Sequence, residues 1–307
     1  MSSTMEYACV QTIDCKQGAI RAVRFNVDGS YCLSCGSDKK IKLWNPYRNL
    51  LLKTYGGHAH EVNDVAAACD SSQIASGASD KSVILWEVTT GQPVRRWREH
   101  ASKITCVKFN EDSSVVVSGS QDNTAMMWDT KSRSHQPIQV LKEARDSITS
   151  VHVSDHEIMT ASLDSRIRRY DIRTGELVTD FMGEPIIDAC FTRDCQCILV
   201  CSTDECLRLF DKATGELLEE YKGHKSDDFR IECCLDSKDS QIFCGSSDGK
   251  IYQWQLVDSN QCSTLVHSVG KSVVNSICSH PTRKYIMSAS GTNVKLWTAE
   301  EDHGQED

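Results

Sequence analysis

Histidine, serine and aspartate recur in this sequence at fixed distances, and these three residue types together could catalyse acyl transfer. One set is His58, Ser76 and Asp80, followed by Trp86, and a second set is His100, Ser118 and Asp122, followed by Trp128. In a hydrolase such a serine is the nucleophile, the histidine is its base and the aspartate orients the imidazole. A catalytic site occurs once in a chain, whereas a motif repeated at a regular interval builds a framework. We therefore predict a structural role for both sets and no enzymatic activity.

The aspartates of these sets belong to a longer repeat, in which an Asp precedes a large aromatic residue by six positions. The pairs are Asp38 and Trp44, Asp80 and Trp86, Asp122 and Trp128, Asp164 and Tyr170, Asp204 and Phe210, and Asp248 and Trp254, while Gly291 precedes Trp297. Successive aromatic residues lie 42, 42, 42, 40, 44 and 43 positions apart. A period of about 40–45 residues with a turn is typical of four-stranded propeller blades. The sequence therefore predicts an all-β, seven-bladed propeller that occupies residues 1–299 as a single domain.

Each repeat divides into four short strands, because apolar residues alternate with polar ones between turn-forming residues. In the second repeat these strands are expected at residues 62–68, 73–77, 82–88 and 93–97. No fourth strand follows Trp297, but residues 9–13 precede the first repeat as the other fourth strands precede theirs. We predict that residues 9–13 pair with residues 294–298, which closes the ring and removes its open edges. The acidic segment 300–307 has too little apolar surface to fold, and we predict a disordered tail.

Composition restricts the partners and the location of the protein. The net charge is −9, whereas proteins that bind nucleic acid are usually basic, so no direct contact with nucleic acid is expected. The first residues lack the basic and apolar regions of a secretory signal, and no apolar run approaches the roughly 18 residues of a membrane span. We expect a soluble monomer without membrane association, located in the cytoplasm or in both cytoplasm and nucleus.

The sequence contains 16 cysteines. In a reducing compartment they are expected to remain thiols and to pack as small apolar side chains. One dense group resembles a metal-binding knot: Cys190, Cys195, Cys197, Cys201 and Cys206. Because successive side chains of a strand point to opposite faces, this group should not converge on one ion. We predict no metal site and no cofactor.

Three groups of residues resemble the WD-repeat family. They are Gly57-His58 with the run 76–80 and Trp86, His100 with the run 118–122 and Trp128-Asp129, and Gly223-His224 with Asp248 and Trp254. In that family the His bridges the Asp of a tight turn to a strand hydroxyl, which meets the indole N–H of the Trp. The resemblance implies a propeller that acts as a non-catalytic scaffold for protein interactions.

Three longer stretches, residues 17–39, 143–158 and 211–225, resemble a narrower group of WD-repeat scaffolds, the mitogen-activated protein kinase organizers. This resemblance implies an adaptor for kinase-cascade components, in a group whose members also occur in pre-mRNA splicing complexes with spliceosomal proteins. A second hypothesis remains open, since Tyr170-Asp-Ile-Arg173 is similar to the Trp-Asp-x-Arg element of substrate receptors in cullin-type ubiquitin ligases. A propeller enzyme or metal protein is a third hypothesis.

Four repeats depart from the family pattern. The first has Lys16 at the place of the His, the fourth has Ala144 and Tyr170, the fifth has Gly183 and Phe210, and the seventh has Gly291 in place of the Asp. We expect these repeats to be held by packing rather than by the polar network, and to open more easily.

Partners should contact the loops of the ring, because the strands are committed to pairing. Candidates at the start of each first strand are Arg21, Glu61, Asn63, Lys103, Thr105, Asp188, Arg230 and Glu232, and candidates just before the turn aspartates are Gln121, Leu163 and Thr203. Such a mixture of charges suits a protein partner better than a polyanion. Phe229 is either an exposed anchor for a partner or a side chain tucked against the neighbouring blade.

Overall fold

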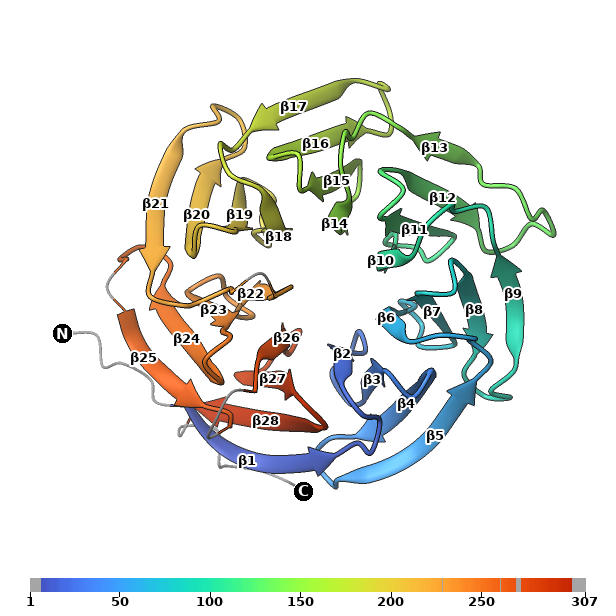
Figure 1. The fold of residues 1–307 in the computed structure, drawn as a ribbon, viewed down its shortest axis with the longest axis horizontal. Helices are drawn as coiled ribbons and strands as arrows, with labels where there is room; N and C mark the ends of the chain where they lie inside the picture. The colour runs from blue at the N-terminus through green and yellow to red at the C-terminus, as the bar shows by residue number, and fades with distance from the viewer. Residues whose placement is uncertain (1–6, 228, 260, 269–271, 300–307) are drawn as a thin grey trace.

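The chain forms a ring of blades around a central axis (Figure 1). The computed structural model describes residues 7–227, 229–259, 261–268 and 272–299, and these residues form seven four-stranded antiparallel sheets. This confirms the predicted all-β, seven-bladed propeller. The described chain contains no helix, and thus none long and apolar enough to cross a membrane. The predicted tail at 300–307 lies outside the described residues.

Every blade has the same order of strands from the centre outward (Figure 1). The innermost strands are β2 (Ile20–Phe25), β6 (Val62–Ala67), β10 (Ile104–Phe109), β14 (Ile148–Val153), β18 (Ile186–Phe191), β22 (Cys233–Leu235) and β26 (Val274–Ser279). The second strands are β3 (Cys32–Gly36), β7 (Gln73–Ala78), β11 (Val115–Ser120), β15 (Glu157–Ser162), β19 (Cys197–Ser202), β23 (Gln241–Gly245) and β27 (Tyr285–Ser290). The third strands are β4 (Lys40–Asn45), β8 (Val83–Glu87), β12 (Ala125–Asp129), β16 (Arg166–Asp171), β20 (Cys206–Asp211), β24 (Lys250–Gln255) and β28 (Asn293–Ala299). The outermost strands are β5 (Leu50–Gly56), β9 (Pro93–Trp97), β13 (Gln139–Leu141), β17 (Leu177–Phe181), β21 (Leu217–Lys222), β25 (Gln261–Val266) and β1 (Tyr7–Asp14).

The first strand of the chain completes the last blade. β1 runs antiparallel to β28, and the register pairs Tyr7 with Ala299 and Ile13 with Val294. The predicted closure of the ring is thus confirmed. Because the seventh blade takes strands from both ends of the described chain, the ring is closed by backbone hydrogen bonds.

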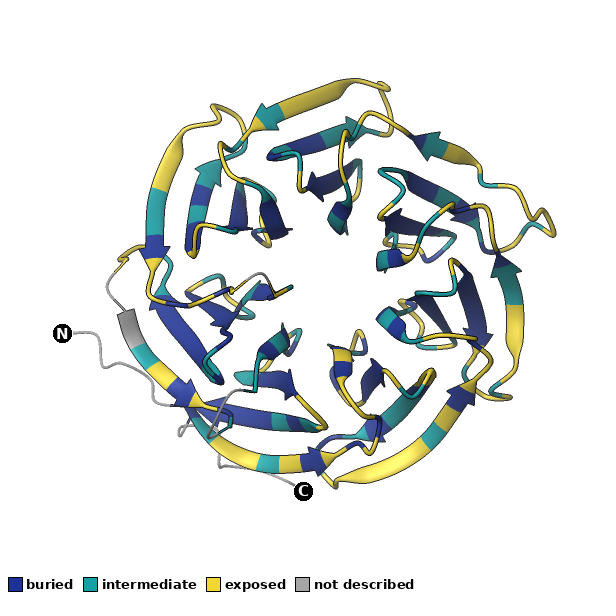
Figure 2. Ribbon diagram, in the orientation of Figure 1, coloured by how far each residue is buried: buried dark blue, intermediate teal, exposed yellow. Residues whose placement is uncertain are grey.

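The hydrophobic core consists of seven clusters, one at each junction between neighbouring blades of the described structure. Trp86 of the second blade, for example, packs against Tyr55 of the first with ring centroids 6.1 Å apart. The second strands are covered on both faces, which explains why a run such as Val115-Val116-Val117 does not alternate with polar residues. Figure 2 shows this burial decreasing toward the outermost strands.

Removing residues 1–14 should destabilise the protein, because β28 would lose its outer partner and the core would lose Ile13. Burial of one such side chain stabilises the fold by about 1.5–3 kcal/mol, so we expect the melting temperature to fall by about 5 °C or more. Calorimetry of this variant beside one that lacks only residues 1–6 measures the effect. Equal melting temperatures would contradict the role of β1.

Candidate functional site

The second blade holds a chain of hydrogen bonds that runs from a tryptophan to an aspartate. Trp86 Nε1 donates to Ser76 Oγ at 2.8 Å, and His58 Nε2 lies 2.8 Å from the same oxygen. The other ring nitrogen of His58 lies 3.1 Å from Asp80 Oδ2. The third blade has the corresponding contacts, with distances of 2.8, 2.8 and 2.9 Å among Trp128, Ser118, His100 and Asp122. The contacts follow the order expected from the sequence.

The aspartate at the end of this chain also holds two loops together. Asp80 accepts hydrogen bonds from the backbone N–H of Ser82 in its own turn and of Ala59 in the loop that follows β5. Burial would raise the pKa of Asp80, but the hydrogen bonds from His58, Ser82 and Ala59 lower it well below its ordinary value. Between Asp80 and Ser82 stands Lys81 with φ 65°, a left-handed conformation that the aspartate stabilises from within the turn.

This arrangement serves stability rather than acyl transfer. Ser76 and Ser118 are completely buried, and each hydroxyl oxygen already accepts a tryptophan N–H. A substrate carbonyl cannot approach such an oxygen without displacing the core. A buried polar group left unpaired in this network would lower the stability of the folded state by about 1–3 kcal/mol, so the complete set of hydrogen bonds stabilises the blade.

The first blade corrects one expectation, because a glutamine performs the role of the histidine. Gln17, and not Lys16, donates from Nε2 to Asp38 Oδ1 at 3.1 Å, and its Oε1 accepts the hydroxyl of Ser34. Trp44 Nε1 donates to the same serine at 2.9 Å. The prediction that packing replaces the polar network was wrong for this blade, since an amide can donate and accept as the imidazole does.

The fourth and fifth blades satisfy the turn aspartate with an arginine. Arg168 lies 2.6 Å from Asp164, and Arg208 lies 2.5 Å from Asp204. In both pairs the arginine follows the aspartate by four residues along the third strand of the blade. In these two blades an ion pair takes the place of the hydrogen bonds that link aspartate, histidine, serine and tryptophan elsewhere. The sequence analysis expected packing alone and missed this ion pair.

The seventh blade, which lacks the turn aspartate, keeps only part of the polar network. Trp297 Nε1 donates to Ser288 Oγ at 2.8 Å. His267 Nε2 lies 3.2 Å from the backbone oxygen of the same serine.

The innermost strands leave one edge facing the central channel, and side chains of the preceding blade bind this edge. Asp64 accepts the backbone N–H of Val107 at 3.1 Å, and Ser276 accepts that of Val23 at 3.0 Å. Two further pairs, Ser150 with Ala189 and Asp188 with Cys233, repeat the contact at 3.0 Å. Backbone carbonyls of the edge are bound in the same way by Asn63 with Ile104, Thr105 with Ile148, and Asn275 with Ile20.

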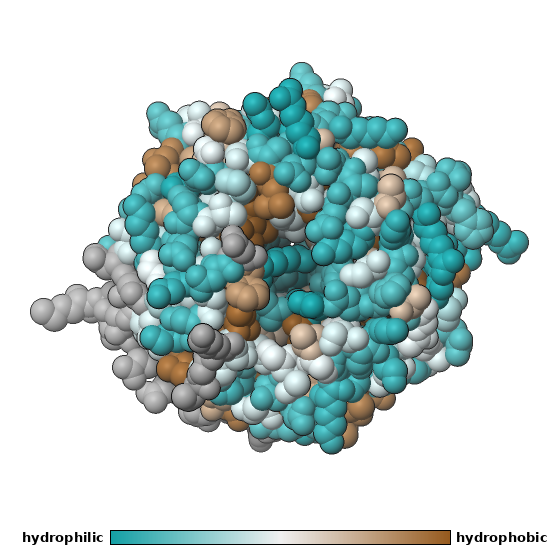
Figure 3. All heavy atoms as spheres, in the orientation of Figure 1, coloured by the Kyte–Doolittle hydropathy of each residue, from teal (hydrophilic) through white to brown (hydrophobic). Residues whose placement is uncertain are grey.

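An ion network crosses the channel at this level. Arg24 of the first blade lies 2.7 Å from Glu232 of the sixth and 2.8 Å from Asp64 of the second. Arg230 reaches the backbone oxygen of Thr105 on the opposite side of the ring. Burial would raise the pKa of Glu232, but the charge and hydrogen bonds of Arg24 lower it to about 2. A cavity of about 400 Å³ is lined by Arg24, Asp64, Arg230 and Glu232, among other residues. Figure 3 shows a hollow at the centre of the ring surrounded mainly by hydrophilic residues.

The structure therefore places several predicted partner-binding residues inside the ring. Asp188 and Glu232 are buried in the channel wall, and Asn63, Thr105 and Arg230 bind the backbone of other blades. The prediction that Asp188 and Glu232 contact a partner is therefore wrong, because their side chains are buried and a docked protein cannot reach them. The sequence contained a signal for part of this channel role, because the third residue is Asp or Ser in four of the seven innermost strands, where an apolar residue is typical of a core.

Other predicted residues lie together on the face of the ring where the turn aspartates stand. In five blades a backbone hydrogen bond joins the residue before the innermost strand to the residue before the turn aspartate: Ala19 with Ser37, Glu61 with Ser79, Lys103 with Gln121, Ser147 with Leu163, and Pro185 with Thr203. Arg21 and Glu61 form an exposed ion pair at 2.8 Å. Phe229 is 52% exposed, so it is not tucked against the neighbouring blade, and Leu163 is 36% exposed. We call the surface formed by Arg21, Glu61, Lys103, Gln121, Leu163 and Phe229 the loop face.

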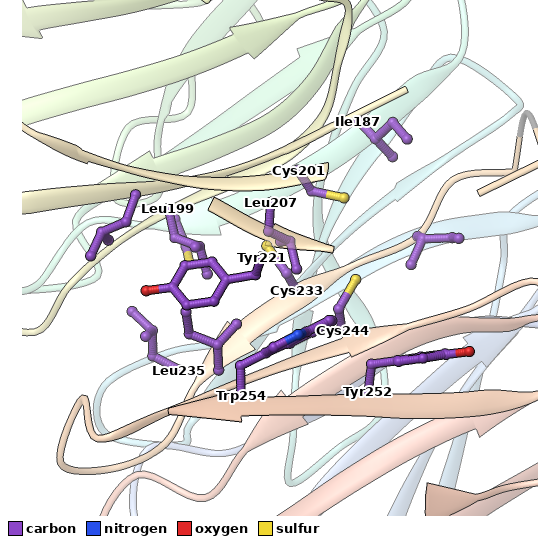
Figure 4. Packing of buried hydrophobic residues seen from close by; sticks show 14 residues of the cluster. Ile187, Leu199, Cys201, Leu207, Tyr221, Cys233, Leu235, Cys244, Tyr252 and Trp254 are labelled. Atoms are coloured by element: carbon purple, nitrogen blue, oxygen red, sulfur yellow. The ribbon is translucent and has the colours of Figure 1, made fainter. Parts of the chain in front are cut away.

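The prediction that the cysteine group scatters holds only in part. Cys190, Cys197 and Cys201 pack at the same junction between the fifth and sixth blades, and Cys201 meets partners from the other blade. Cys201, His224 and Cys244 are buried, and their ligand atoms all lie within 4.8 Å of one another. Figure 4 shows the sulfur atoms of Cys201 and Cys244 pointing into the same space between two blades. Cys32 and Cys35 have a spacing common among zinc ligands, yet they pack in different core clusters. Sequence analysis missed the triad because its members are far apart along the chain.

Replacing His100 by alanine should destabilise the protein more than replacing His135. The first change removes one buried partner from each of Ser118 and Asp122 and leaves a cavity, so it should lower the free energy of unfolding by about 2–3 kcal/mol. His135 is exposed on a loop, and its replacement should change stability by less than about 0.5 kcal/mol. Denaturant unfolding of both variants measures the difference. Equal losses would contradict the structural role of His100.

Replacing Asp188 by asparagine should stabilise the protein increasingly as the pH rises from 5 to 8. Burial and the charge of Glu232 raise the pKa of Asp188 to about 7, above the value of about 3.9 in an unfolded chain. The native state therefore binds the proton of Asp188 more tightly than the unfolded state does. The stabilisation that this proton provides is present at low pH and is lost as the pH approaches 7. Melting temperatures across this range test the trend. Asp188→Ser, which copies Ser150 and Ser276, should behave alike, and a gain confined to low pH would contradict the assignment.

Comparison with known proteins agrees with this geometry. The family model described as "WD domain, G-beta repeat" matches residues 7–45, 49–87, 91–129, 215–255 and 260–298. The unmatched region between 129 and 215 contains the blades with Tyr170 and Phe210. WD repeat domain-containing protein 83 of Xenopus tropicalis is 59% identical over 93% of this chain and 90% of its own length. The protein of that name from Rattus norvegicus is 54% identical over 95% of this chain and 92% of its own length. A Dictyostelium discoideum homologue is 32% identical over 97% of this chain and 100% of its own length. By its repeats, its fold and these matches, the chain belongs to the WD-repeat family.

Proposed function

We propose that this protein is a non-catalytic adaptor that brings kinase-cascade components together, and that it also joins pre-mRNA splicing complexes. WD-repeat proteins generally act as scaffolds for protein interactions. The particular partners are proposed from the resemblance of residues 17–39, 143–158 and 211–225 to the kinase organizers. We propose that the protein works in both cytoplasm and nucleus, where such partners occur.

The observation that carries this proposal is the construction of the loop face. Its backbone is held by the hydrogen bonds between strand starts and turns, so its loops need little ordering when a partner binds. Charged side chains of both signs stand there beside the apolar Leu163 and Phe229. Apolar anchors surrounded by a polar rim are typical of protein-binding surfaces.

A substrate receptor of a cullin-type ubiquitin ligase is the second candidate, and one observation favours it. The side chain of Arg173 is 69% exposed just after the end of β16, and it forms an ion pair with Asp171 at 3.3 Å. A guanidinium so placed is accessible to an adaptor protein. The position of Tyr170, where the ligase element has Trp, weakens the resemblance.

Replacing Phe229 by alanine should reduce capture of kinase-cascade and spliceosomal proteins without unfolding the ring. The change removes a phenyl group from the surface and not from the core, so the fold should be unaffected. Aromatic residues at interfaces often contribute 2 kcal/mol or more to binding, about a 30-fold change in affinity. Affinity purification of the full chain from cells, quantified by mass spectrometry, measures the loss. The matched control is Phe181→Ala, since Phe181 is 65% exposed on the outermost strand of the fourth blade and is not one of the residues of the loop face.

Equal capture by the two variants would exclude Phe229 as an anchor. Recovery of a cullin adaptor that disappears with Arg173→Ala, in the absence of kinases and splicing factors, would support the second candidate and overturn the first.

A further inference from the structure

The sixth blade departs from the polar network in a way that the sequence pattern hides. His224, Asp248 and Trp254 are present, but Cys244 occupies the strand position held by Ser76 in the second blade. Asp248 is bound by the hydroxyl of Tyr252 at 2.9 Å. Within the described part of the chain, neither Nδ1 of His224 nor Nε1 of Trp254 has a hydrogen-bond partner. The residues of the network are therefore retained here without its contacts.

The imidazole of His224 is directed to a sulfur atom of the neighbouring blade instead. Its Nε2 lies 3.8 Å from Cys201 Sγ. The position of Cys201 on the second strand of a blade faces the next blade, and in the third blade it is Gly119, where a Cβ would come within 2.7 Å of Ile148 Cγ2 in the fourth blade. A side chain as long as cysteine at this position reaches the next blade.

We propose that Cys201, Cys244 and His224 form a binding site for one thiophilic metal ion between the fifth and sixth blades. Metal–sulfur bonds of about 2.3 Å and metal–nitrogen bonds of about 2.0–2.1 Å require ligand atoms about 3.5–4.0 Å apart. The ligand atoms, all within 4.8 Å of one another, meet this condition after small rotations of the side chains.

The donor set selects ions of one chemical class. Two thiolates and an imidazole are soft ligands that bind Zn²⁺ and Cu⁺, whereas Mg²⁺ and Ca²⁺ require oxygen ligands. Zn²⁺ would neutralise both thiolates in this buried place, which avoids an uncompensated charge. Cu⁺ would leave one negative charge but needs no ligand beyond these three side chains.

A metal ion here would fasten the junction at which the polar network is weakest. The fifth blade has Val200 at the position of the network serine, and the sixth has Cys244 there. An ion bound to Cys201 on one blade and to Cys244 and His224 on the other would join both blades. Because it binds only the folded ring, it stabilises that state in proportion to the logarithm of its concentration.

The test is metal binding by the full chain under reducing conditions, with Zn²⁺ and Cu⁺ as separate arms. We expect one equivalent of one of these ions after chelator treatment and reloading, measured by elemental analysis and competition with a coloured chelator. Co²⁺ should give thiolate-to-metal absorption. Cys244→Ser, which restores the serine of the other blades, should weaken binding more than about 100-fold, since even loss of a residue supporting a ligand costs 10–100-fold. The metal-induced rise in melting temperature should disappear with it.

The matched control is Cys35→Ala, because Cys35 occupies in the first blade the position that Cys201 occupies in the fifth. It should retain the metal. Cys201→Ala, which copies Ala161 and Ala289, serves as the second ligand variant if Cys244→Ser does not fold. No stoichiometric Zn²⁺ or Cu⁺ in the wild type, or equal binding by a ligand variant, would overturn the proposal.

Discussion

The innermost strand of every blade has one edge that no other strand covers, so its backbone groups need partners from elsewhere. A buried N–H or C=O left unpaired costs about 1–3 kcal/mol, and a ring of seven such edges would be costly. The structure meets this constraint with side chains of the preceding blade, such as Asp64, Ser150 and Ser276. Each bond also fixes the position of one blade against the next. The ring is thus joined through its polar centre as well as through the apolar clusters between blades.

The turn aspartates show how one requirement can be satisfied by different residues. The carboxylate in the second blade is bound by His58, that in the first by Gln17 and that in the fourth by Arg168. All three side chains donate hydrogen bonds to the equivalent carboxylate of their own blade, so the aspartate keeps its place in the turn while the rest of the network changes. A repeat that deviates in sequence is therefore not necessarily a weaker blade.

The residues available for binding partners are those that these hydrogen bonds do not engage. The channel residues are occupied with one another, and the networks within blades are buried. The side chains of the loop face stand on a fixed backbone and remain accessible, which suits a scaffold that binds other proteins. The junction of the fifth and sixth blades differs, since its network positions carry Val200 and Cys244 and its histidine faces a thiol. The loss of the polar network at this junction leaves a cluster of two thiols and one imidazole.

The sequence by itself determined the number of blades, their four strands and the closure by residues 9–13. Those features depend on turns and alternation within about 40–45 residues, and such local patterns repeat visibly. It also indicated the polar sets of the second and third blades. Only the tertiary structure decided that Gln17 replaces His, that Arg230 and Glu232 lie in the channel, and that Cys201 meets His224 and Cys244. These contacts join different blades or depend on side-chain direction, and the bond between Val23 and Ser276 spans 253 residues of chain. Closure of the ring creates them, and no local pattern encodes which residues it brings together.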